Sequence, residues 1–229
     1  MGKLIKCHFY YILNKLTIVI LILVILSVIF FSFFTALSFD ERTAFYLTQV
    51  DYYLSVYEVI KLIMFILIIL LFGYSFSSVN DGYYVVVIGK DISRTKYLIT
   101  KIFLLNSIFT FIYLIVVAST IIIGLSFNIV LNKEMLISFI NLYILLMFYG
   151  ELSIILVLLF DNIYAVFLLI PLSLISYDKT IYFLSFFLPI EEKQNVSRTF
   201  VLPLWYYIFE YLIIHLVINL LFNKKDLPH

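Results

Sequence analysis

Long apolar runs separated by short polar stretches set the pattern of this chain. A bilayer core about 30 Å thick needs roughly 20 apolar residues per helix, and this length divides the chain into six predicted membrane spans. They cover residues 16–37, 55–74, 102–124, 135–160, 163–177 and 202–222. We therefore predict an all-α polytopic membrane protein that forms a single transmembrane domain over residues 1–229. An even number of crossings puts both chain termini on one side of the membrane.

Apolar and polar residues before the first span recur with the period of an α-helix. One helical face holds Leu4, Ile5, His8, Phe9, Ile12, Leu13 and Leu16, and the other holds Lys3, Lys6, Cys7, Tyr10 and Asn14. This pattern predicts an amphipathic interfacial helix at residues 1–15, lying on the membrane surface. A signal peptide is the alternative, but the apolar run at 16–37 is about twice too long for one. We expect that run to stay as the first transmembrane helix.

The fifth span is short, contains Pro171, and is followed by a second apolar run at residues 181–190. One continuous helix through both runs would bury Asp178 and Lys179 in hydrocarbon, which costs several kcal/mol unless they pair. A short span followed by a re-entrant segment avoids that cost, provided that protein or a water-filled cavity covers the segment. We expect this external re-entrant or loop segment at residues 178–201, with the single long helix as the alternative.

Basic residues beside the spans indicate the orientation, because they are more frequent on the cytoplasmic side. With the N-terminus inside, the cytoplasmic side holds Lys3, Lys6, Lys15, Lys90, Arg94, Lys96, Lys101, Lys224 and Lys225. The outer side then holds Arg42, Lys133, Lys179, Lys193 and Arg198. We therefore predict a multi-pass protein of the cell membrane with both termini in the cytoplasm.

The composition agrees with a membrane protein and excludes several kinds of site. The chain is 65% hydrophobic and 13% charged, whereas soluble domains are about half apolar and about a quarter charged. A net charge of +1 gives no indication of a nucleic-acid partner. The single cysteine cannot form an intrachain disulfide, and the three histidines are too scattered to suggest a metal site.

The sequence contains no recognisable site for hydrolysing ATP. A phosphate-binding P-loop needs a glycine, four further residues and then Gly-Lys-Ser/Thr, but Gly89-Lys90 is followed by Asp91 and position 84 is Tyr. No nucleophile and base stand at a catalytic spacing. We expect no enzymatic activity and no bound cofactor, so the energy for any active transport must come from a partner or an ion gradient.

Ionisable residues inside spans are the default functional candidates in a membrane protein. Glu58 and Lys61 are three residues apart, which predicts a structural ion pair near the outer end of the second span. Glu151 lies roughly mid-membrane in the fourth span, and Glu210 and His215 lie in the last. Each glutamate is either a structural carboxyl bonded to a neighbouring helix or a polar point on a transport path or subunit seam.

The densest basic cluster lies between the second and third spans, at residues 75–101. Here the sequence resembles the ABC-2 type permeases, the membrane subunits of one class of bacterial ATP-driven exporters. The resemblance rests on Asp81-Gly82, the apolar stretch 85–88, Ser93-Arg94, Tyr97, Lys101 and the C-terminal stretch 222–227. Two features depart from the family pattern: Asp91 stands where proline is common, and the charged run before the glycine is reduced to Asn80-Asp81.

The resemblance implies a cytoplasmic coupling segment at residues 75–100 that docks on a separate ATPase. The implied contact residues are Asp81, Gly82, Ser93, Arg94, Tyr97 and Lys101, with the Asp161-Asn162 turn as a second contact point. Arg94, Tyr97 and Lys101 share one helical face, although anchoring at anionic headgroups would also explain the basic residues.

The family assembles two permease subunits, either copies or paralogues, with two ATPases that bind ATP and Mg²⁺. The expected function is export of a hydrophobic or amphipathic substrate, with peptides such as toxins or bacteriocins as the first candidate. The alternatives are a proton-driven transporter that uses Glu151 or Glu210, and a non-transporting scaffold.

Overall fold

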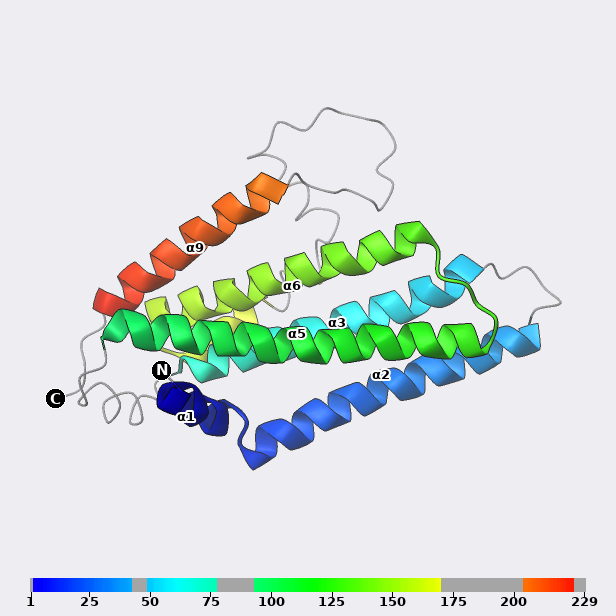
Figure 1. The fold of residues 1–229 in the computed structure, drawn as a ribbon, viewed down its shortest axis with the longest axis horizontal. Helices are drawn as coiled ribbons and strands as arrows, with labels where there is room; N and C mark the ends of the chain where they lie inside the picture. The colour runs from blue at the N-terminus through cyan, green and yellow to red at the C-terminus, as the bar shows by residue number, and fades with distance from the viewer. Residues whose placement is uncertain (1, 43–48, 78–92, 170–203, 225–229) are drawn as a thin grey trace.

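The computed structural model describes residues 2–42, 49–77, 93–169 and 204–224 (Figure 1). The regular elements in these residues are all helical, as the sequence predicts. They are α1 (Gly2–Ile12), α2 (Lys15–Arg42), α3 (Gln49–Ser75), α5 (Arg94–Ser126), α6 (Lys133–Phe160), the 3₁₀ helix η2 (Ile163–Leu168) and α9 (Leu204–Lys224).

Helices α2, α3, α5 and α6 are long and apolar enough to cross a membrane, and they coincide with the first four predicted spans. These helices indicate a membrane-embedded protein. The last predicted span corresponds to α9, whose described side chains begin at Tyr211. The fifth span begins as η2, a 3₁₀ helix instead of an α-helix. Most of that span and the predicted re-entrant segment at 178–201 lie outside the described residues.

Helix α3 forms the centre of the bundle, with α2, α5, α6 and η2 packed around it (Figure 1). Its inward face is fully buried at Ile60, Met64, Ile68 and Phe72. Helix α3 also packs closely against α6, where a Cβ added at Gly150 would lie 2.8 Å from Cγ1 of Ile68. Small residues of this kind let the backbones of membrane helices approach closely.

Helix α2 is peripheral and most of its apolar surface is uncovered. Only 17% of its span is buried, against 50% of the α3 span. Apolar side chains that no other helix covers suit contact with lipid tails. Helix α2 therefore forms one outer side of the bundle.

The first helix ends earlier than predicted. It stops at Ile12, and Oδ1 of Asn14 accepts hydrogen bonds from the amide of Thr17 (2.8 Å) and from its hydroxyl (3.0 Å). Asn14 thus caps the first turn of α2. The prediction that Asn14 and Leu16 continue the two faces of the first helix was wrong, because Leu16 lies on α2 and is 70% exposed. The predicted apolar face does hold for Leu4, His8 and Ile12, which are buried.

The four long helices alternate in direction, and α9 runs antiparallel to α5 (Figure 1). Tyr97, near the start of α5, stacks on Phe222 near the end of α9. Asn106 contacts Tyr211 at a point two and a half turns further along α5 and about three turns earlier in α9. Helices α6 and α9 therefore run in the same direction. The start of α5, the end of α9 and the helix α1 meet at one end of the bundle, which we call the joint end.

Candidate functional site

Helices α5, α6 and α9 surround a groove of about 800 Å³. Most of its wall is apolar, with aromatic rings contributed by all three helices. The apolar lining consists of Phe103, Phe111, Leu114, Ile144, Met147, Phe148, Leu212 and Ile214. The polar lining consists of Asn106, Ser107 and Thr110 on α5, Tyr143 and Glu151 on α6, and Tyr211 on α9. An apolar pocket with a few convergent polar groups is the usual form of a small-molecule site.

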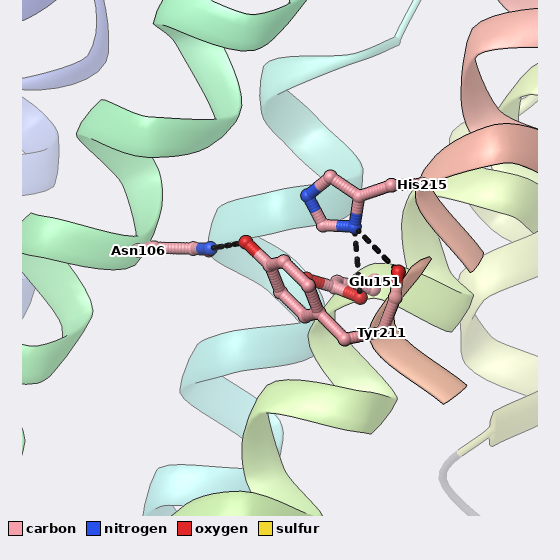
Figure 2. A network of polar contacts seen from close by, with 4 residues as sticks. All are labelled: Asn106, Glu151, Tyr211 and His215. Carbon is pink, nitrogen blue, oxygen red and sulfur yellow. Dashed lines mark hydrogen bonds and ion pairs between the residues drawn. The ribbon is translucent and has the colours of Figure 1, made fainter. Parts of the chain in front are cut away.

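Glu151 is the only acidic residue among the lining residues that the structure describes, and it is 1% exposed. One carboxylate oxygen, Oε2, lies 3.6 Å from Nδ1 of His215 on α9 (Figure 2). The same Nδ1 lies 3.1 Å from the backbone carbonyl of Tyr211, to which it can donate a hydrogen bond. Nδ1 of His215 therefore lies between two acceptors, the Glu151 carboxyl and the Tyr211 carbonyl, and is closer to the carbonyl.

Tyr211 connects this pair to α5. Its ring lies against the ring of His215, with centroids 3.9 Å apart. Nδ2 of Asn106 points at the Tyr211 hydroxyl at 3.5 Å, which is long for a hydrogen bond. Oδ1 of Asn106 is buried and has no hydrogen-bond partner among the described residues. In either orientation of the amide, only one of its two polar atoms, Nδ2 or Oδ1, faces the Tyr211 hydroxyl, and the other can form a hydrogen bond with another group.

The sequence identified Glu151 and His215 as separate candidates but did not pair them. Glu151 lies nine residues before the end of α6 at Phe160, and His215 lies nine residues before the end of α9 at Lys224. Equal distances from the same side of the membrane put two side chains at the same depth, so this signal was available. Glu210 lies in α9, and its side chain is outside the described residues.

Four of the residues expected to couple to an ATPase, Ser93, Arg94, Tyr97 and Lys101, lie at the joint end. Ser93 caps α5 by accepting a hydrogen bond from the amide of Lys96. The guanidinium of Arg94 donates to the backbone carbonyl of Asn223 at 3.1 Å, near the end of α9. Tyr97 and Lys101 are 1% and 5% exposed. Asp81 and Gly82 lie outside the described residues.

The shared face of Tyr97 and Lys101 is turned into the bundle. Nζ of Lys101 lies 4.4 Å from the ring centroid of Phe76 and 5.4 Å from that of Tyr97, both at cation–π distance. It also donates to the Tyr97 hydroxyl at 3.4 Å. The ring of Phe222 stacks on Tyr97 at 6.0 Å. This buried cluster joins the end of α3, the start of α5 and the end of α9.

His8 connects α1 to the same cluster, which the sequence did not predict. Its ring meets the ring of Tyr97 edge-on at 4.6 Å, and the residue is 1% exposed. Burial, with a smaller contribution from the charge of Lys101, lowers the pKa of His8 to about 4. The imidazole is therefore neutral at physiological pH, as expected for a histidine packed beside a buried ammonium group.

Two further predictions concern pairs of polar residues. The predicted ion pair is confirmed, with Nζ of Lys61 3.1 Å from Oε2 of Glu58. The Asp161-Asn162 turn is exposed, and Oδ1 of Asn162 accepts a hydrogen bond from the amide of Tyr164 to begin η2. Asp161 adopts a positive φ of 49°, a conformation that aspartate tolerates better than most residues.

Comparisons of the chain with protein-family models, with curated proteins and with solved structures found no match. Among the described residues, no group of three or more His, Cys, Asp or Glu side chains could hold a metal ion. The functional argument therefore rests on the groove, on the joint end and on the sequence resemblance.

Proposed function

We propose that this chain is the membrane-spanning permease subunit of an ATP-driven exporter, powered by a separate ATPase. The observation that carries the proposal is the joint end. The residues before Arg94 lead directly into α5, and α5 is one wall of the groove. Arg94 and Tyr97 hold the end of α9, a second wall, to the start of α5. A push on the segment before α5 would therefore move two groove walls together relative to α6.

In this proposal the coupling segment is residues 75–100, on the cytoplasmic side. The exposed residues near it and the buried ones have different roles. Ser93 and Lys96 are exposed, as are Asp161 and Asn162. Tyr97 and Lys101 are buried and would transmit movement within the bundle. Two ATPases would act on two permease subunits, and the chain would bind no nucleotide itself.

The direction of the helices supports the proposed topology of six spans with both termini in the cytoplasm. Helices α6 and α9 run in the same direction, as expected if the chain crosses the membrane once more between them. The groove supports a hydrophobic or amphipathic substrate, because most of its lining is apolar. An apolar peptide of the toxin or bacteriocin type remains our first candidate.

A proton-driven transporter is the second candidate, and the Glu151–His215 contact favours it. A carboxyl group and an imidazole 3.6 Å apart in the wall of an intramembrane groove could exchange a proton during a transport cycle. This candidate requires no ATPase and places the energy input at mid-membrane instead of at the joint end.

Uptake of a fluorescent apolar peptide into inverted membrane vesicles distinguishes the two candidates. The first predicts uptake that needs ATP, is inhibited by vanadate and persists with a protonophore. Uptake that persists without ATP and stops with a protonophore would contradict it and favour the second. Wild-type chain should also co-purify with a P-loop ATPase.

Two matched charge reversals test where the ATPase acts. Lys96 and Lys133 are exposed lysines near the start of α5 and of α6, at opposite ends of the bundle. Lys96→Glu should lower both ATPase co-purification and ATP-driven uptake several-fold, whereas Lys133→Glu should leave both unchanged. Equal effects of the two substitutions would argue against docking at the joint end.

A further inference from the structure

A second cavity, of about 450 Å³, lies between α1, α2 and α5, and we call it the crevice. Its described lining is apolar except for Ser107. Three of the lining residues, Leu21, Leu104 and Ile112, are buried. Two others, Phe9 on α1 and Ile22 on α2, are 46% and 50% exposed. The crevice is therefore closed by helices on its inner side and open on its outer side.

The crevice has the length of one leaflet of a bilayer. On α5 its lining extends from Leu104 to Ile115, which is eleven residues or roughly 16 Å at 1.5 Å per residue. Half of a hydrocarbon core about 30 Å thick is about 15 Å. On α2 the lining begins at Ile18, one turn after the helix starts at Lys15. The crevice thus covers the depth that an acyl chain of one leaflet occupies.

Two exposed lysines stand where the crevice begins. Lys15 precedes Ile18 by one turn on the same face of α2, and Lys6 precedes Phe9 by one turn on the same face of α1. The chain turns between these helices, and α1 lies at the joint end beside the start of α2 (Figure 1). None of the described lining residues is acidic. An apolar slot with positive charges at its entrance is complementary to a molecule with an anionic head and a long apolar tail.

We propose that the crevice binds an anionic phospholipid of the bilayer. One acyl chain lies along α2 and α5, and the phosphate accepts hydrogen bonds from the ammonium groups of Lys6 and Lys15. Basic pockets between membrane helices bind anionic headgroups in this way. Because α1 lines the crevice and also packs on the start of α5 through His8 and Tyr97, the bound lipid stabilises α1 at the joint end.

This inference goes beyond the proposed function, because it requires neither an ATPase nor transport. It can be tested on the purified full chain in dodecyl maltoside by native mass spectrometry. The two probes are dioleoyl phosphatidylglycerol and dioleoyl phosphatidylcholine, which have the same acyl chains and differ in net charge. Each lysine near an anionic headgroup is worth roughly 5-fold in affinity. We therefore expect the first phosphatidylglycerol to bind at least about 5-fold, and up to roughly 30-fold, more tightly than phosphatidylcholine.

Substitutions assign the headgroup preference and the acyl-chain site to different residues. Lys6→Gln and Lys15→Gln should each lower phosphatidylglycerol binding by roughly 5-fold and leave phosphatidylcholine unchanged. Lys224→Gln is the matched control, because Lys224 is exposed at the same end of the bundle but lies on α9, which does not line the crevice. Ile22→Trp fills the crevice and should weaken both lipids several-fold. Leu23→Trp, at an exposed neighbour outside the described lining, should weaken neither.

A third probe, glycerol phosphate, carries the anionic head without an acyl chain and should not displace the lipid when added in excess. Displacement would show a site for a free anion and would overturn the proposal. Equal binding of the two lipids would also overturn it, as would equal effects of Lys15→Gln and Lys224→Gln. If Ile22→Trp does not fold, these three comparisons decide the matter.

Failure of this inference can be distinguished from failure of the proposed function. Lipid selectivity in a chain that shows no ATP-driven transport would refute the proposed function alone. ATP-driven transport by a chain that binds the two phospholipids equally would refute the lipid site alone.

Discussion

Gly124, in the last turns of α5, permits the closest contact with the start of α3. A Cβ added there would lie 2.6 Å from the hydroxyl of Tyr53 and 3.1 Å from Cε1 of Tyr52, where ordinary contact begins at 3.4 Å. The Tyr53 hydroxyl donates to the buried carbonyl of Ile129 at 3.1 Å. Gly124→Ala must therefore displace that hydroxyl by several tenths of an ångström.

The expected cost follows from two opposing contributions. Losing the hydrogen bond and leaving the Ile129 carbonyl without its donor costs about 1–3 kcal/mol, and the displaced ring adds strain. Replacing glycine by alanine in a helix returns up to about 1 kcal/mol. We therefore expect Gly124→Ala to lower the free energy of unfolding by about 1–2 kcal/mol, measured by denaturation with SDS in mixed micelles.

A double-mutant cycle with Tyr53→Phe tests the cause. Phenylalanine lacks the hydroxyl that the new methyl group would approach most closely. Alanine at position 124 should therefore cost clearly less in that background, where only the contacts at 3.1 Å to Cε1 of Tyr52 and 3.2 Å to the ring carbon Cζ of residue 53 remain. The predicted coupling energy is about 1 kcal/mol or more, in the direction that makes the double variant more stable than the sum of the single ones. Additive effects within about 0.5 kcal/mol would refute the proposed contact between the hydroxyl and the methyl group.

The remaining predictions concern α1 and the joint end. Asn14→Ala should destabilise the protein by about 1 kcal/mol in the same assay because α2 loses its cap, while Asn14→Ser, which can still cap, should cost less than half as much. Burial lowers the pKa of His8 to about 4, below the 6.5 of a free histidine. The neutral, buried imidazole therefore contributes fully to the stability above about pH 6.5, and this contribution is lost as the pH falls toward 4. His8→Phe should show a smaller loss of stability over that range. Lys101→Ala empties the space between Phe76 and Tyr97 and should cost about 2–4 kcal/mol, whereas Lys101→Met, which keeps the apolar stem, should cost much less.

The four long helices were predictable because hydrocarbon thickness imposes a length that a sequence displays directly. The end of α1 was not predictable, because the helical pattern of the sequence continues through Asn14. The capping hydrogen bonds between Asn14 and Thr17 depend on a change of chain direction that this pattern does not show. The Glu58–Lys61 pair was predictable because its spacing lies within one helix. For Glu151 and His215, the equal distances from the helix ends indicate a similar depth. Whether α6 and α9 are neighbours depends on how helices distant in sequence come together, and the sequence gives no direct measure of that.

The buried face of α5 at the joint end shows the same limit of prediction from sequence. Helical spacing correctly put Arg94, Tyr97 and Lys101 on one face, but spacing does not say whether a face meets a partner protein or the rest of its own chain. Charge suggested an outward face, because a lysine is seldom fully buried without a compensating group. The rings of Phe76 and Tyr97 provide that compensation, and Phe76 lies in a different helical segment from Lys101.

The ammonium group of Lys101, which lies against the rings of Phe76 and Tyr97, also restricts how α5 can move. Sliding of α5 along its axis would pull the ammonium group away from the two rings, whereas rocking about Lys101 leaves it in place. Leu114 lies thirteen residues beyond this pivot, or roughly 20 Å at 1.5 Å per residue. A rocking motion of about 10° would shift Leu114 by roughly 3 Å on that lever arm. A small rotation at the joint end would thus widen or narrow the far part of the groove by about the diameter of a water molecule.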